Sequence, residues 1–167
     1  MNELIEILKN LDWSPLYISI KTAAVATAIS FILGIKLARK MLFCRSRKKA
    51  LIDGIMSLPM VLPPTVAGFI LLIVFSKNRP LGIWLNDELN ISIIQTWAGC
   101  IIAATIISFP LMYQNARAAF DQVDKNIIYS ARTLGLSERI IFYKVLVPSS
   151  RPGLVAGSIL CFARAMG

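Results

Sequence analysis

Long apolar runs that are poor in charge constrain this chain more than any other feature of its sequence. Three of them lie at about residues 17–37, 55–75 and 91–113. Each is close to the roughly 20 residues that a helix needs to cross a bilayer. A fourth run covers residues 152–167. The runs predict an all-α fold, a polytopic transmembrane helical bundle in a single domain over residues 1–167.

The first and last runs each have a second interpretation. A cleaved signal peptide would explain the first run, but the residues before it, Glu3, Glu6, Lys9 and Asp12, are net negative. Signal peptides begin with positive charge and have a shorter apolar core, so a retained span is favoured. The fourth run is too short to cross a bilayer. We therefore expect an incomplete span and a chain that is a fragment, with its last span or spans missing.

The charges are distributed as in a membrane protein. Hydrophobic residues make up 56% and charged residues 16% of the chain, whereas soluble domains have about 45–50% and about 25%. The net charge of +9 comes from two basic segments, one on each side of the second and third runs taken together. Cytoplasmic loops are rich in Lys and Arg, which predicts a cell (inner) membrane protein with its N-terminus outside. Nucleic acid is not the expected partner. The basic residues are Lys36, Arg39, Lys40, Arg45, Arg47, Lys48 and Lys49, then Arg117, Lys125, Arg132, Arg139, Lys144 and Arg151.

Several kinds of chemistry are excluded. The chain has no histidine and only three scattered cysteines, without the spacing of a metal site or a disulfide framework. It has no P-loop sequence for a nucleotide. The three complete runs lack Asp and Glu, and residues 22–35, 55–75 and 91–113 lack Lys and Arg as well. Proton relays depend on such residues within the membrane. We expect no cofactor, no metal and no enzyme activity, so uphill transport would need energy from a partner.

Prolines interrupt the second run in "SLPMVLPPTVAGF", at Pro59, Pro63 and Pro64. Each proline removes a helical hydrogen bond and restricts the residue before it. Carbonyls freed in lipid need protein groups or water in a cavity. Either a kinked span or a broken helix entry that faces a translocation pathway fits this pattern.

The segment "YSARTLGLSERIIFYKVLVPSSRPGL" predicts two short helices on one of the basic segments. Asp124 is a suitable N-cap of the first helix, and Gly135 suits the left-handed position that ends it. Ser137 can cap the second helix, Pro148 ends it, and Pro152 begins the next span. An apolar stripe of the first helix consists of Ile127, Ile128, Ala131 and Leu134, and an apolar face of the second includes Ile141.

Three uses of this helical hairpin compete. Reading DNA requires polar side chains at base edges, and "ERIIFYKVLV" is mainly apolar. A passive amphipathic hairpin on the lipid surface is the second. The third is a docking element whose apolar face enters a groove on a partner protein.

The hairpin resembles the cytoplasmic coupling loop of ABC-transporter permeases, with its Glu-Ala-Ala signature, a glycine and a later proline. Tyr129, Ser130 and Ala131 fall on the signature, Gly135 on the glycine and Pro148 on the proline. The resemblance implies a coupling loop at about residues 114–151, in which Leu134 and Ile141 also serve ATPase docking. Tyr129 replaces the acidic residue that in the family helps to hold the ATPase, so that polar contact is in doubt.

"SLPMVLPPTVAGFILL" and "RPGLVAGSILCFARAMG" are similar to permeases of the molybdate group, which are close to those for sulfate and tungstate. The resemblance covers about residue 16 to the end. It implies a type I importer with two permease copies, cytoplasmic ATPase subunits and an extracytoplasmic oxyanion-binding protein. Sulfate, tungstate or another oxyanion is the alternative cargo. A membrane scaffold whose basic loops bind anionic lipid is the alternative of another class, and a secondary carrier is disfavoured by the uncharged spans.

Overall fold

A computed structural model describes residues 12–42, 46–76, 79, 83 and 96–167, without the side chains of residues 46–49 and Pro64. The described residues form helices and no strands, which confirms the all-α prediction. Two helices are long and apolar enough to cross a membrane, or up to four if each of two bent helix pairs counts as one span. The helices are α2 (Ser14–Leu42), α3 (Ser46–Val61), α4 (Pro64–Val74), α6 (Trp97–Asp121), α7 (Lys125–Thr133), α8 (Glu138–Ile141), the π-helical η1 (Phe142–Leu146), α9 (Val147–Ser149) and α10 (Arg151–Met166).

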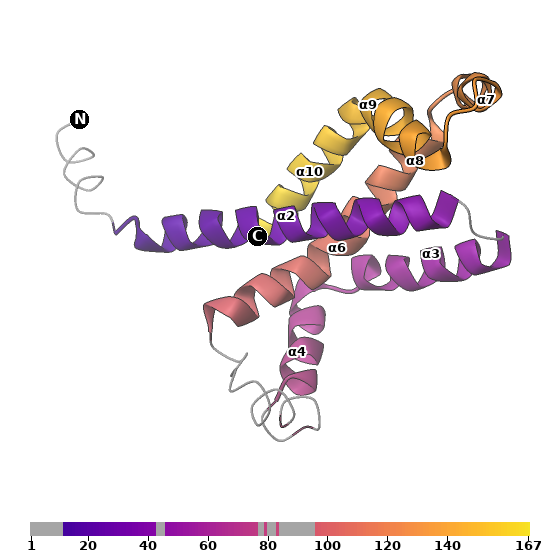
Figure 1. The fold of residues 1–167 in the computed structure, drawn as a ribbon. Helices are drawn as coiled ribbons and strands as arrows, with labels where there is room; N and C mark the ends of the chain where they lie inside the picture. The colour runs from indigo at the N-terminus through magenta and orange to yellow at the C-terminus, as the bar shows by residue number, and fades with distance from the viewer. Residues whose placement is uncertain (1–11, 43–45, 77–78, 80–82, 84–95) are drawn as a thin grey trace.

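The core of the described fold is a packed group of α2, α6 and α10, which cross one another in Figure 1. The buried face of α2 carries a small residue every four positions, so these residues share one side of the helix. Such residues allow the backbones of membrane helices to approach closely. At Gly34 an added Cβ would lie 2.9 Å from Met112 Cγ in α6. The small residues are Ala26, Ser30, Gly34 and Ala38.

Helix α6 begins where the Thr96 side chain accepts a hydrogen bond from the Gly99 N–H at 3.2 Å. It continues to Asp121 and therefore includes residues 114–121 of the segment considered as a coupling loop. Residues 91–95 of the third predicted run lie outside the described residues, as do Glu3, Glu6, Lys9 and Arg45. The predicted run at residues 17–37 lies within α2, and the run at residues 152–167 coincides with α10 except for its last residue.

The second apolar run does not form one straight helix. Residues of α3 and α4 on either side of Leu62 and Pro63 meet at an angle of 108°. Pro63 has an extended conformation (φ −54°, ψ 140°) and its carbonyl accepts from the Val66 and Ala67 N–H groups at 3.0 and 3.1 Å. Pro59 lies inside α3, and Pro64 begins α4. The structure thus contains the broken helix that the prolines allow. Helix α3 packs on α6, and α4 turns away from the direction of α3 (Figure 1).

The C-terminal ends of α2 and α6 lie at the same end of the fold as the short helices α7, α8 and α9 (Figure 1). Leu42 of α2 and Phe120 of α6 line one cavity together with Tyr129 of α7. The described parts of the two basic segments are therefore close together in space.

Candidate functional site

The hairpin of α7, α8 and η1 is built by local interactions that its sequence predicts. Asp124 caps α7, and its side chain accepts a hydrogen bond from the Asn126 N–H at 2.9 Å. At the other end Gly135 has φ +76°, a conformation that favours glycine. These observations confirm the predicted cap and the predicted left-handed glycine.

Two backbone bonds close the turn at Gly135. The Gly135 N–H donates to the Arg132 carbonyl at 2.9 Å, and the Leu136 N–H donates to the Ala131 carbonyl at 3.2 Å. This pair of bonds is a Schellman motif, which satisfies carbonyls at the end of a helix. The direction of the chain between α7 and α8 is therefore fixed by Gly135.

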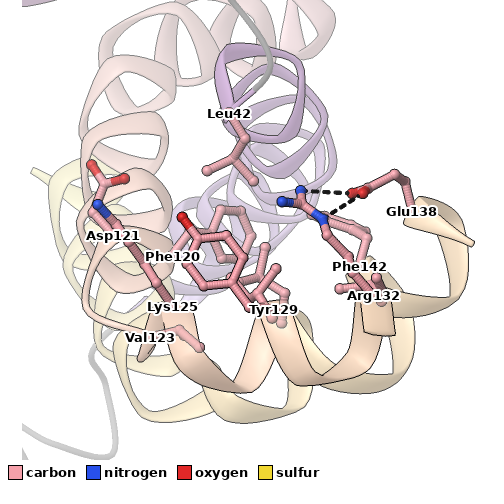
Figure 2. Close-up of a pocket in the computed structure, with 12 residues that line it drawn as sticks. Leu42, Phe120, Asp121, Val123, Lys125, Tyr129, Arg132, Glu138 and Phe142 are labelled. Carbon is pink, nitrogen blue, oxygen red and sulfur yellow. Dashed lines mark hydrogen bonds and ion pairs between the residues drawn. The ribbon is translucent and has the colours of Figure 1, made fainter. Parts of the chain in front are cut away.

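An ion pair also joins α7 to α8. The Arg132 guanidinium binds the Glu138 carboxylate at two points, Nε to Oε1 at 2.7 Å and the second nitrogen to Oε2 at 3.3 Å (dashed in Figure 2). The carboxylate raises the pKa of Arg132. The pair adds a bidentate link across the turn. Ser137 occupies the predicted N-cap position of α8, but no cap hydrogen bond from its side chain is present.

The four residues of the predicted apolar stripe, three in α7 and Leu134 at its C-cap, differ in exposure. Ile127 and Leu134, seven residues apart, are 48% and 79% exposed, whereas Ala131 is 6% exposed. Ile128 is partly buried and packs against the core cluster. Helices α8 and η1 both pack on α7, and this packing leaves Ile127 and Leu134 exposed.

The predicted site residues of the hairpin also differ in exposure. Tyr129, Ser130, Leu134 and Gly135 are exposed, whereas Ala131 and Ile141 are buried. Pro148 is partly buried. The hairpin thus offers an outer surface that is apolar at Ile127 and Leu134, and it is held from within by Ala131 and Ile141.

A cavity of about 340 Å³ lies between the hairpin and the ends of α2 and α6 (Figure 2). The Tyr129 ring lines it, with the Arg132 guanidinium carbon 5.9 Å from the ring centre. Asp121 and Lys125 add charge to the rim. Tyr129, which stands at the acidic position of the family signature, is therefore in contact distance of a cation within its own chain.

Pro148 does not end the second helix, contrary to the sequence-based prediction. It lies within the short helix α9, and the chain bends by 71° only after Ser149. Proline lacks the N–H of a helical bond and its ring crowds the preceding turn; the wider π-helical turn of η1 comes directly before it. Ser150 marks the bend, where its Oγ donates to the Leu146 carbonyl at 2.7 Å. Pro152 occupies the first turn of α10 as predicted.

Polar residues next to the apolar runs form a cluster that the sequence analysis missed. The Tyr113 hydroxyl of α6 donates to Asp53 Oδ1 of α3 at 2.7 Å, and Arg117 forms an ion pair with Asp53. The Gln114 amide donates to Ser57 Oγ at 3.3 Å between the same two helices. The sequence shows only that Asp53 and Arg117 lie just outside the uncharged runs. Their separation along the chain does not predict that they form a pair.

Within the described residues no group of three or more His, Cys, Asp or Glu side chains is placed to hold a metal ion. A second, largely apolar cavity of about 490 Å³ lies between α4 and α6, and Phe69, Phe75 and Cys100 are among its lining residues. Thr65, which directly follows Pro64, also lines this cavity.

Comparison with known proteins gives consistent matches. Residues 18–167 match the family described as the binding-protein-dependent transport system inner membrane component. The molybdenum transport system permease protein ModB of Escherichia coli K12 is 35% identical over 161 residues, which cover 96% of this chain and 70% of that protein. ModB of Azotobacter vinelandii is 32% identical over 93% of this chain and 69% of its own length. The sulfate transport system permease protein CysT of Escherichia coli K12 is 31% identical over 90% of this chain and 54% of that protein.

Proposed function

Since the chain belongs to the family of binding-protein-dependent transport system inner membrane components, as an ABC-transporter permease of the molybdate and sulfate group, we propose that it lines the pathway of a molybdate importer. It is a multi-pass membrane protein of a family that is not itself enzymatic. The similarity to two molybdenum permeases supports molybdate as cargo. Sulfate is the second candidate, because a sulfate permease is also similar.

The observation that carries the proposal is the outer surface of the hairpin. Ile127 and Leu134 are exposed on α7, beside a turn that Gly135 fixes in one conformation. An apolar helix face of this kind suits a groove on a partner protein. We assign that role to a cytoplasmic ATPase, with Tyr129, Ser130 and Leu134 in the contact and Ala131, Ile141 and Pro148 supporting it.

The energy for transport would come from the ATPase subunits. A partner shifts a conformational equilibrium only by binding its two states with different affinity, and nucleotide binding gives the ATPase such a difference. Two permease copies would surround the pathway, and an external binding protein would deliver the oxyanion. The break at Pro59, Pro63 and Pro64 is the proposed pathway element, because irregular backbone in a membrane needs a packed or water-filled surrounding.

The orientation follows from the charges. The described basic residues of the two segments lie at the hairpin end of the fold, where Leu42, Phe120 and Tyr129 share a cavity. We propose that this end faces the cytoplasm and that the N-terminus lies outside, in the inner membrane. Protease treatment of intact spheroplasts should leave the hairpin uncut; cleavage there would overturn the orientation and the ATPase contact together.

The test is a substitution at the turn. Gly135→Pro removes the N–H that donates to Arg132 and cannot adopt φ +76°, so ATP-driven molybdate uptake should be abolished while the protein still inserts in the membrane. Gly135→Asn is the matched control, because Asn tolerates the left-handed region, and it should retain most of the uptake. Uptake that survives Gly135→Pro in the complete transporter contradicts the coupling role.

The substitution Tyr129→Glu restores the acidic residue of the family signature. We expect ATPase association in a pull-down to be preserved or strengthened. In the family the acidic residue helps to hold the ATPase, and Tyr129 occupies an exposed position where a Glu side chain could reach the partner. A clear loss of association would show that the tyrosine has a contact of its own with the ATPase.

A further inference from the structure

Arg39, near the end of α2, reaches the hairpin. Its guanidinium carbon lies 4.6 Å from the ring centre of Phe142 and 5.2 Å from that of Tyr143. One of its terminal nitrogens donates a hydrogen bond to the Tyr143 hydroxyl at 3.2 Å. A single cation thus contacts both aromatic residues that begin the π-helical segment η1.

Phe142 extends this contact to a third helix. Its side chain is 3% exposed and meets the ring of Phe120, in the last turn of α6, edge to face at 5.6 Å. Arg39, Phe142 and Phe120 therefore form a continuous stack between α2, η1 and α6. We refer to these three residues and Tyr143 as the Arg39 joint.

The position of the joint matters because α7 and α8 pack chiefly on each other and on η1. Helix η1 is therefore a main packing contact through which a displacement of α7 and α8 can reach the long helices. A π-helical turn is uncommon and is frequently found at functional sites. Helix α2, to which Arg39 belongs, in turn packs along both α6 and α10.

We propose that Arg39 is a positioning residue for transport, which holds the hairpin to α2 and α6 through Phe142 and Tyr143. The role rests on the proposed function of the hairpin. When the ATPase displaces the hairpin, the joint makes the spans follow, and without it η1 turns independently of α2. A planar guanidinium stacks on one ring and hydrogen-bonds to the other at the same time, which a lysine ammonium does less well.

The experiment uses the complete transporter, with its ATPase and binding protein, in proteoliposomes. Molybdate uptake and ATP hydrolysis are measured in the same vesicles for Arg39→Gln. We expect the molybdate imported per ATP hydrolysed to fall about fivefold, the factor for a lost cation–π contact of about 1 kcal/mol, while ATP hydrolysis stays near the wild-type rate. The exposed neighbour Lys40 provides the control, and Lys40→Gln should leave the ratio unchanged.

Two further variants separate positioning from simple stability. Arg39→Lys keeps the charge and should restore part of the ratio, and Tyr143→Phe keeps both rings and should reduce the ratio less than Arg39→Gln does. The proposal is overturned if Arg39→Gln imports as much molybdate per ATP hydrolysed as the wild type. It is also overturned if uptake, ATP hydrolysis and the yield of assembled complex all fall in proportion. A wild-type complex that hydrolyses ATP in the presence of the binding protein but imports no oxyanion overturns the proposed function instead.

Discussion

Helix α6 makes two contrasting kinds of contact with the helices around it. Toward α10 and α2 it packs so closely that glycines are needed. An added Cβ at Gly153 would lie 2.6 Å from Ala119 Cβ, and one at Gly157 would lie 2.8 Å from Asn115 Cβ. Toward α3, by contrast, α6 is held by polar side chains, above all Tyr113 and Arg117 with Asp53.

The difference indicates which parts move together. Closely packed helices have one good arrangement, because a shift of a few tenths of an ångström produces either overlap or a void. The Asp53 carboxylate and the Arg117 guanidinium at the α3 contact are 31% and 23% exposed, so water can replace the partners of this ion pair at small cost. We expect α2, α6 and α10 to move as one body, and α3 with the broken α3–α4 connection to move relative to it.

Breaking the close contact should have the largest effect. Gly153→Leu places a branched side chain where even a Cβ overlaps with Ala119. The neighbouring atom is a methyl group attached directly to the backbone, so the helices themselves must separate. Overpacking of this kind costs about 3 kcal/mol or more, and we expect little folded protein in detergent, measured by fluorescence-detected size-exclusion chromatography after heating.

Gly54→Leu is the matched control for that variant. Gly54 is an exposed glycine of α3, and an added Cβ there meets nothing within 4 Å. For Gly54→Leu, the temperature at which half of the folded protein is lost should remain within a few degrees of the wild-type value. Equal loss of folded protein in both variants would mean that the α6–α10 contact is no tighter than the exposed side of α3.

Weakening the polar contact between α3 and α6 should affect transport more than folding. Asp53→Asn removes the charge that binds Arg117 and weakens the acceptor for Tyr113. Hydrogen bonds to charged groups are worth about 1.5–3 kcal/mol, and partial exposure reduces this to about 1 kcal/mol. Arg117 retains Asp121, whose Oδ2 lies 3.6 Å from its Nε.

We therefore expect Asp53→Asn to remain folded but to change the rate of molybdate uptake, since the contacts that hold α3 to α6 would be weaker. Tyr113→Phe, which removes one hydrogen bond and leaves the ion pair, should change the rate in the same direction and by less. An Asp53→Asn protein with wild-type uptake and reduced thermal stability would show that the cluster is a static brace.

The hairpin shows how much of such a site the sequence predicts. Asp124, Gly135 and Pro152 act through backbone conformations and bonds within a few residues, and their predicted positions are confirmed. The burial of the individual residues in the predicted stripe could not be predicted, because it depends on where α8 and η1 pack, which periodicity does not specify. The prediction that Pro148 ends the second helix is wrong, because the π-helical turn before α9 accommodates the proline.

The same limit applies to the contacts between helices. Apolar runs predict that helices of the lengths of α2 and α6 exist, because bilayer thickness sets that length. Asp53 and Tyr113 are 60 residues apart, and Arg39 and Tyr143 are 104 apart. No local rule pairs residues at such separations, so these contacts are known only from the structure.

The smallest expected effect concerns a buried contact between two hydroxyl groups inside the close interface. Ser30 Oγ of α2 lies 3.0 Å from Ser108 Oγ of α6, and both residues are buried. Ser108 also donates to the Ala104 carbonyl at 2.7 Å, and Ser30 lies 3.4 Å from the Thr105 carbonyl, so each hydroxyl keeps an acceptor when the other is removed. Hydrogen bonds between membrane helices average about 0.6 kcal/mol in double-mutant cycles.

Unfolding of Ser30→Ala, Ser108→Ala and the double variant should therefore give a coupling energy of about 0.6 kcal/mol, below the effect of Asp53→Asn. The reason is that alanine fits the same small-residue face and preserves the close approach of α2 and α6, which the glycines and alanines already provide. A coupling energy above about 2 kcal/mol would show that the α2–α6 contact depends on hydrogen bonding as the α3 contact does. The two sides of α6 would then differ in exposure alone, and the expectation that α2, α6 and α10 move as one body would lose its basis in packing.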